Sequence, residues 1–282
     1  MLKHRIRRLM TSDAPPPVPS PHHAALPYSH VALVHYRPPD GRVNFGDHLA
    51  RVVVAQLLAT HQRTLDDETR TRARMLAIGS ILHFAQDGDV VWGSGVNGKM
   101  PEETFTARRL DVRAVRGPLT AAFLRRRGIE APSVFGDPAL LLPHLLGGRF
   151  RATRSVPYVF VPNFHDLPLV AHEPHVVSPL DGWNRVVARI LDARLVLASS
   201  LHGLIIAEAF GIPARWVRLS ETEHPFKYQD YYLGTGRTRF DHARSIGEAL
   251  EMGGLPSPSF DVEPLLAAFP WDLWGSSRHA DC

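Results

Sequence analysis

Short apolar runs alternate with amphipathic segments along the chain from about residue 29 onward. Each apolar run has the length of a buried strand, and the segments between them repeat their apolar residues at helical spacing. Strands that alternate with helices form parallel sheets, because a parallel neighbour is reached only through a long crossover connection. The pattern therefore predicts an α/β fold.

The alternation falls into two units. In residues 28–148, apolar runs such as 89–95 predict the strands of a doubly wound parallel sheet, with helices over 47–58 and 117–128. Glycines and charged residues in 147–155 then interrupt the pattern, as an interdomain linker does. We therefore expect residues 28–148 to form an N-terminal Rossmann-like domain.

Residues 149–282 repeat the alternation and predict a second Rossmann-like domain. Its expected strands are 156–163, 175–178, 194–200 and 214–219, and its expected helices are 182–193, 202–210, 242–253 and 262–269. The last of these helices could pack back on the N-terminal domain. Because ligands of parallel sheets bind at the carboxyl ends of the strands, we expect the ligand site in a cleft between the two domains.

The first 27 residues differ from the rest, because they hold six prolines and favour an extended, flexible tail. Four basic residues against Asp13 place a net charge of +3 in this tail, out of +4 for the chain. The remaining body is nearly neutral, so we expect no nucleic-acid binding, which needs a folded basic surface. A solvated tail is one interpretation, and peripheral contact with anionic lipid at a membrane surface is the alternative.

Composition narrows the setting. Hydrophobic residues make up 44% and charged residues 21%, which is typical of globular proteins. The single cysteine, Cys282, excludes disulfides and cysteine-based zinc sites and favours a reducing compartment. No apolar run approaches the roughly 18 residues of a membrane span, and no signal-peptide core follows the amino terminus. We expect a cytoplasmic protein, with peripheral association at the inner face of the plasma membrane as an open alternative.

The strongest local signal is a turn from an apolar strand into an apolar helix, Ser199-Ser200-Leu201-His202-Gly203. Free N–H groups at a helix N-terminus favour a phosphate or carboxylate, and small residues allow it to approach closely. His202 could bind the anion or transfer a proton near neutral pH. The structural alternative is that Ser200 only caps the helix.

A second strand leads directly into a helix at Arg116. A guanidinium there could clamp a phosphate or carboxylate through two parallel hydrogen bonds, although a structural pairing with an acid is equally plausible. Gly93, Ser94 and Gly95 form a glycine turn after an apolar strand. It matches a dinucleotide-binding loop only weakly because no helix follows at once, so it predicts either a backbone approach to substrate or a simple tight turn.

Two further loops end near the expected cleft. Asn44 and Asp47 precede an apolar helix, where the aspartate could cap the helix and the asparagine could shape a substrate loop. His165 and Asp166 follow a strand of the second unit and are candidate proton-transfer groups, with a solvated turn as the alternative. Asp137 stands between a glycine and a proline and favours a structural turn.

These strings, in their order and spacing, resemble the polysaccharide pyruvyl transferase family, particularly its bacterial exopolysaccharide branch. The resemblance spans almost everything after residue 29 and rests on NFGDHL, WGSG, VRGPLT, FGDPALLLP, VPNFHD, SSLHGLIIAEAFGIP, KYQDYY and LLAAFPWDLW. It implies two Rossmann-like domains arranged as in GT-B glycosyltransferases, with phosphoenolpyruvate as the donor substrate in the interdomain cleft. It also implies a saccharide acceptor, which could be lipid-linked, and neither a metal nor a cofactor.

The resemblance assigns His202 to donor binding or acid catalysis. Many members have Arg-Leu-His where this chain has Ser200-Leu201-His202, so Arg116 or Lys227 would have to supply the missing positive charge. In the implied reaction, protonation of the donor methylene carbon precedes attack by one sugar hydroxyl, and phosphate loss and a second attack close a ketal. We expect His202 to supply or orient the proton and His165 or Asp166 to accept one from the hydroxyl.

Two other functions stay open at this point. A GT-B glycosyltransferase that uses a nucleotide sugar would share the fold and the phosphate site at a helix terminus. A non-catalytic polysaccharide-assembly or binding protein would keep the fold without the reaction, and the missing arginine makes this worth testing. A nicotinamide enzyme is disfavoured by the broken glycine fingerprint.

Overall fold

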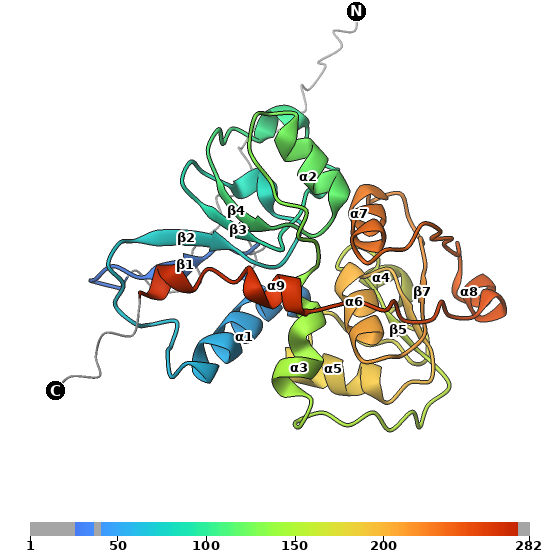
Figure 1. Ribbon diagram of the computed structural model, residues 1–282. Coiled ribbons are helices and arrows are strands. Elements are labelled where there is room, and N and C mark those ends of the chain that lie inside the picture. Colours follow the sequence, from blue (N-terminus) through green and yellow to red (C-terminus); the bar gives the residue numbers. More distant parts are fainter. Residues whose placement is uncertain (1–25, 37–40, 276–282) are drawn as a thin grey trace, which may run out of the picture.

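The computed structural model describes residues 26–36 and 41–275. The predicted tail, apart from its last two residues, and Cys282 lie outside the described residues. The prediction of an α/β fold with parallel sheets is confirmed, because the two sheets are parallel throughout and helices connect many of their strands (Figure 1). No helix among the described residues is long and apolar enough to cross a membrane.

The first sheet contains four strands in the order β1-β2-β3-β4. They are β1 (Val31–Leu33), β2 (Ala73–Leu76), β3 (Val90–Trp92) and β4 (Asp111–Ala114). A doubly wound sheet reverses its strand order at one point, but within the described ranges this sheet follows chain order without a reversal. The expected doubly wound order is therefore corrected.

Helices of the first unit are α1 (Phe45–Thr60), α2 (Pro118–Arg125) and α3 (Leu142–Leu146), with 3₁₀ turns η1 (Leu82–Phe84), η2 (Glu102–Thr104) and η3 (Pro138–Leu141). Only η1 lies between β2 and β3, and only η2 between β3 and β4. The segment from Gly93 to Pro101 contains three glycines and a proline, which disfavour a helix and leave a loop beside the sheet.

The second sheet has the order β5-β6-β7, formed by β5 (Val159–Val161), β6 (Val196–Ala198) and β7 (Ala214–Trp216). Its helices are α4 (Leu167–Val170), α5 (Trp183–Leu191), α6 (Leu201–Ala209), α7 (Phe226–Gly234) and α8 (Ile246–Met252). The strand expected at 175–178 was wrong, because only a single bridge joins Val176 to Phe160. Pro174 and Pro179 flank this segment and shorten any pairing there.

The chain returns to the first sheet at its carboxyl end through α9 (Glu263–Ala267) and η4 (Trp271–Trp274). Trp92 of β3 donates its indole N–H to the carbonyl of Leu265 over 2.9 Å and packs edge-on against Phe269. Figure 1 shows this red segment lying across the first sheet near α1. One hydrophobic core joins residues of both sheets, so the two units are packed against one another.

The loops that follow the strands of both sheets converge. Ser80 follows β2, Lys99 follows β3, His165 follows β5, and His202 follows β6. Because parallel strands of one sheet all end at the same edge, each sheet brings its loops together, and the packing of the two units sets those edges opposite each other. The result is a cavity between the units.

Candidate functional site

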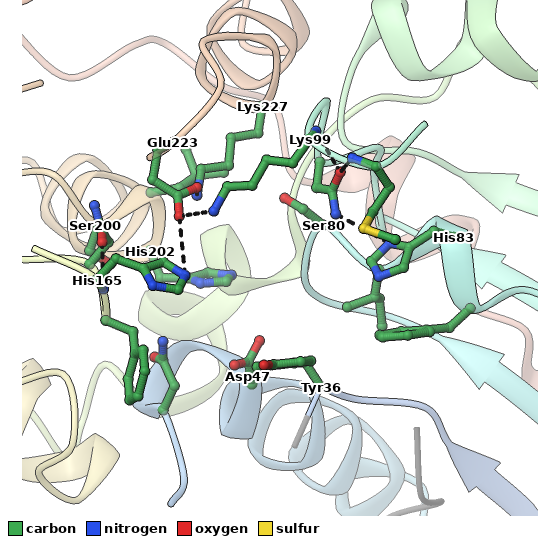
Figure 2. A pocket seen from close by; sticks show the side chains of 18 residues that line it. Tyr36, Asp47, Ser80, His83, Lys99, His165, Ser200, His202, Glu223 and Lys227 are labelled. Atoms are coloured by element: carbon green, nitrogen blue, oxygen red, sulfur yellow. Dashed lines mark hydrogen bonds and ion pairs between the residues drawn. The ribbon is translucent and has the colours of Figure 1, made fainter. Parts of the chain in front are cut away.

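The cavity has a volume of about 380 Å³, within the range of sites for small molecules. It takes residues from both units: Tyr36, Asn44, Asp47, Ser80, His83, Asn97 and Lys99 from the first, and Asn163, His165, Ser200, Leu201, His202, Glu223 and Lys227 from the second. Figure 2 shows the labelled side chains pointing toward a common space from opposite sides. The expected site between two units of the chain is therefore present as a cavity.

The start of α6 forms one wall. Ser200 is the N-cap, and its hydroxyl accepts a hydrogen bond from the amide of Gly203 at 3.3 Å. His202 points its Nε2 away from solvent toward the Asp137 carboxylate, 3.7 Å away. That nitrogen is buried and makes no hydrogen bond. Asp137, expected to be a turn residue, caps η3 with its other oxygen and thus serves both purposes.

The start of α1 lies against His202. Asn44 is the N-cap and accepts a hydrogen bond from the amide of Gly46 at 2.9 Å, so the cap expected of Asp47 is made by Asn44 instead. The carboxylate of Asp47 is left for the cavity. Burial raises the Asp47 pKa to about 6, while His202 and Lys227 oppose the shift.

Two lysines share one carboxylate at the opposite wall. Lys99 and Lys227 both pair with Glu223, and His165 lies 4.0 Å from the same carboxylate (Figure 2). Burial opposes the ionisation of Glu223, but Lys227 and Lys99 outweigh it and hold the pKa of this carboxyl below its usual range. Burial lowers the pKa of the Lys227 ammonium, and Lys99 and Arg116 add to this effect. Two cations that share one anion leave a positive charge in excess.

The loop after β3 places Lys99. The Asn97 side chain accepts hydrogen bonds from the amides of Lys99 and Met100 at 2.8 and 3.1 Å, forming a local turn. Gly98 has a φ of +76°, and a Cβ there would come 2.7 Å from both His224 and Phe226. A larger residue would therefore separate this loop from the second unit.

Sequence reasoning missed Lys99 and Glu223. A signal was available, because the sequence contains only three lysines, Lys3, Lys99 and Lys227, against 29 arginines. Lysine is a compact cation and is not interchangeable with arginine, so two lysines in the body of such a chain are unusual. Both of them line the cavity.

Arg116 does not line the cavity, and its expected role as a phosphate clamp is corrected. The side chain is 1% exposed, and its guanidinium bonds to Asp230, the Ser80 hydroxyl and the carbonyl of Val96. No part of the fork is left for a ligand. Asp230 lies in α7, so Arg116 joins the cavity loops of the first unit to the helix that carries Lys227.

The glycine turn after β3 is also a packing feature. A Cβ at Gly93 would come 2.2 Å from Pro138, and a Cβ at Gly95 would come 2.4 Å from the guanidinium carbon of Arg116. The Ser94 hydroxyl donates to the carbonyl of Gly79 at 2.8 Å. These three residues lie behind the cavity wall, so the expected direct contact with substrate is corrected.

Three residues expected at the second wall lie behind it. Ser199 accepts a hydrogen bond from the Asn163 amide, and Gly203 packs against Val161, where a Cβ would come within 2.9 Å. Asp166 is 2% exposed and accepts hydrogen bonds from Asn163 and Ser220, each at 2.6 Å. Its expected role as a base that faces the substrate is corrected, because its carboxylate is enclosed. His165 does face the cavity.

The remaining polar groups give no metal site. Among the residues that the structure describes, no group of three or more His, Cys, Asp or Glu side chains could hold a metal ion. Burial lowers the pKa of His83, at the first-unit side of the cavity, to about 4, so this ring is neutral near pH 7. The cavity thus combines an anion-binding wall, a protonatable carboxyl group and two accessible histidines.

Comparison with known families decides the classification. The sequence model of the polysaccharide pyruvyl transferase family matches residues 44–221, which is more than half of the chain. The chain belongs to the polysaccharide pyruvyl transferase family. The match begins at Asn44 in the first wall and includes His202, while Glu223 and Lys227 lie just beyond it.

Relatives of this family member support the assignment. The succinoglycan biosynthesis protein ExoV of Rhizobium meliloti (strain 1021) is 30% identical over 210 residues, which cover 69% of this chain and 62% of that protein. The chain therefore matches less than two thirds of that relative's length. An uncharacterized protein of Acanthamoeba polyphaga mimivirus is 24% identical over 253 residues, covering 83% of this chain and 86% of the viral protein.

A solved structure of a functionally uncharacterized Klebsiella pneumoniae protein aligns with this pyruvyl transferase family member at a TM-score of 0.49 and 11% identity, over 76% of this chain and 91% of the other. This likeness is too distant to support a functional argument. The bacterial exopolysaccharide branch expected from the sequence is in agreement with the family match and with ExoV.

Proposed function

We propose that this chain transfers a pyruvyl group from phosphoenolpyruvate to two hydroxyls of one sugar, forming a pyruvate ketal on a surface polysaccharide or its lipid-linked precursor. The observation that carries the proposal is the pair Lys99 and Lys227 around the single carboxylate of Glu223, at the mouth of α6. The family membership supports pyruvyl transfer, and the printed name of ExoV supports a polysaccharide as the product.

The charge of the cavity suits this donor. Phosphoenolpyruvate carries a phosphate and a carboxylate on three carbons, so its site needs several cations or N–H donors within a small volume. Lys99 and Lys227 contribute one positive charge beyond what Glu223 neutralises. The first turn of α6, after Ser200, adds unpaired backbone N–H groups. These lysines take the place that we first assigned to Arg116.

The two histidines supply the remaining polar chemistry. His202, held between Gly46 and Asp137, supplies or orients the proton for the donor. His165 is half exposed beside Glu223, where it can accept the proton of an attacking sugar hydroxyl. The reaction needs neither a metal nor an organic cofactor, because protonation and phosphate loss involve no change of oxidation state.

The acceptor has room next to the donor. A second cavity of about 180 Å³ shares His83, Asn97 and Met100 with the first. Its other walls include Phe105 and Phe226, which suit the apolar face of a sugar ring. We propose a GT-B-like arrangement with the donor between the two units and the acceptor entering from this side. The single cysteine suits a reducing compartment, so we place the reaction in the cytoplasm, beside the membrane if the acceptor is lipid-linked.

The direct test is incubation of the protein with phosphoenolpyruvate and a panel of synthetic or lipid-linked saccharides. Ketal formation releases phosphate and adds the mass of a pyruvyl group with loss of water. Thermal protection by phosphoenolpyruvate, without protection by nucleotide sugars, would support the donor through ligand linkage. Protection by a nucleotide sugar alone would favour glycosyl transfer, and binding of saccharides without phosphate release from any of them would favour a non-catalytic role.

A further inference from the structure

Two carboxyl groups face the cavity, and their surroundings are opposite. Glu223 is held by Lys99 and Lys227, with His165 beyond them. Asp47 makes no hydrogen bond or ion pair with any residue of the described ranges. An ionised carboxylate in a partly buried site normally acquires a partner, because an uncompensated charge there is costly. Asp47 is therefore the carboxyl group that is better suited to hold a proton.

The position of Asp47 is rigid. It lies in the first turn of α1, where the backbone is held by the Asn44 cap. Its Oδ1 lies close to the turn after β2, because a Cβ at Gly79 would come 3.8 Å from it. The preceding residue, Gly46, is in contact with the His202 ring. The carboxyl group is thus fixed between the first unit and the start of α6, on the side of the cavity opposite Glu223 (Figure 2).

The titration of Asp47 agrees with this geometry. The start of a helix and the nearby cations His202 and Lys227 favour the ionised form, yet burial prevails and raises its pKa to about 6. Lys99 lies beyond Lys227, and Glu223 neutralises part of their charge. An anionic donor that enters between Asp47 and the lysines would raise this pKa further, since like charges disfavour ionisation. Donor binding would thus load the proton that the reaction consumes.

We propose that Asp47 is the general acid that protonates the methylene carbon of phosphoenolpyruvate, while His202 orients the donor. This inference rests on the proposed function and decides which group supplies the proton. The other titratable groups are less suited to the task. Glu223 is held ionised by two lysines, His83 is neutral near pH 7 with a pKa of about 4, and the inward Nε2 of His202 is turned toward Asp137.

The reaction balances with Asp47 as the acid. Its proton forms the new C–H bond at C3, and C2 becomes the cationic centre that one acceptor hydroxyl attacks through oxygen. The bond from C2 to the phosphate oxygen then breaks with its electron pair on the phosphate, and the second hydroxyl attacks C2. Of the two hydroxyl protons released, one returns to Asp47 and the other leaves on the phosphate.

The test compares Asp47→Asn and Asp47→Glu with the wild-type protein, using phosphoenolpyruvate and a saccharide that the wild type converts. We expect Asp47→Asn to bind phosphoenolpyruvate within about threefold of wild type and to lose about 10²–10⁴-fold in kcat. Asp47→Glu keeps an acid and should recover part of the turnover. Asp67→Asn, at an exposed position remote from the cavity, is the control and should match wild type.

Two further readouts separate an acid from a merely structural residue. In D₂O, wild type should place one deuterium in the methyl group of the product, and Asp47→Asn should do so only at its reduced rate. Wild-type kcat should fall as pH rises past the pKa of Asp47 in the donor complex, and this basic limb should be missing from the residual activity of Asp47→Asn and shifted in Asp47→Glu.

The outcomes distinguish this inference from the proposed function. If Asp47→Asn keeps kcat within about threefold of wild type, or keeps the same basic limb, Asp47 is not the acid even though phosphoenolpyruvate is the donor. If wild type itself neither binds phosphoenolpyruvate nor releases phosphate with any acceptor, both proposals fail together. Should Asp47→Asn not fold, Asp47→Glu with an unshifted limb and wild-type turnover would still refute the assignment.

Discussion

The imidazole of His202 lies directly over Gly46, so that a Cβ built at residue 46 would come 2.2 Å from His202 Nδ1. This contact joins the start of α1 to the start of α6, which are 156 residues apart in the chain. We expect Gly46→Ala to displace the His202 ring and to reduce kcat at least tenfold. Gly247→Ala, in α8 with open space at its Cβ, is the matched control and should be neutral or stabilise by roughly 0.5–1 kcal/mol. Equal activity of the two variants would contradict the importance of the contact.

His202→Ala removes a ring that faces the donor site. We expect kcat with phosphoenolpyruvate to fall by about 10²–10⁴-fold, because a group that positions a reactant or transfers a proton contributes this much. His172→Ala removes a ring whose side chain is 75% exposed, outside the cavity lining, and should leave turnover unchanged. Phosphate release measured under donor saturation distinguishes the two. Unchanged turnover in His202→Ala would show that its assigned role is wrong.

Lys99→Met and Lys227→Met each remove one of the cations that surround Glu223. A hydrogen bond to a charged group commonly contributes about 1.5–3 kcal/mol, so we expect each variant to weaken phosphoenolpyruvate binding roughly 10- to 100-fold. Titration calorimetry measures the change in Kd. Arg109→Ala removes an exposed cation and controls for general electrostatic attraction, which salt should screen. Equal donor affinity in all three variants would place the donor elsewhere.

Arg116→Ala should act on stability before it acts on donor binding. It would leave the fully buried carboxylate of Asp230 without its cation, and breaking a buried pair commonly costs about 3–5 kcal/mol of unfolding free energy. Arg113→Ala breaks an exposed pairing with Asp111 and Asp272 and should cost no more than about 1 kcal/mol. Urea unfolding of both variants makes the comparison. A large increase in donor KM with normal stability would instead restore the phosphate clamp.

The raised pKa of Asp47 predicts how stability depends on pH. A carboxyl group with a pKa of 3.8 in the unfolded chain and about 6 in the folded one binds more protons when folded. Its contribution to stability is complete below about pH 4 and is lost as pH rises through about 6. Asp47→Asn lacks this loss, so it should be more stable than wild type by about 1–2 kcal/mol at pH 7 and show little difference at pH 4. Denaturant unfolding at both pH values would expose a constant difference, which would contradict the prediction.

Local sequence patterns determined much of the fold and part of the site. Hydrophobic periodicity predicts the strands of both sheets and the helices that follow them, because a strand or helix buries one face according to its own repeat. The same local logic placed Asn44, Ser200 and His202 at helix starts beside a cavity. It failed at 175–178, where flanking prolines limit pairing, and it did not predict α7.

Only the tertiary structure decided which charges face the ligand. Arg116 and Lys99 both follow strands of the first sheet and are similar candidates in the sequence. Arg116 is removed from the cavity by Asp230, a partner 114 residues away, whereas Lys99 reaches the cavity by pairing with Glu223, 124 residues away. The strength and direction of an electrostatic interaction depend on distance and burial in three dimensions, and neither quantity is contained in local spacing. The chain therefore encodes where its loops end, and the packing of its two units selects which of their side chains form the site.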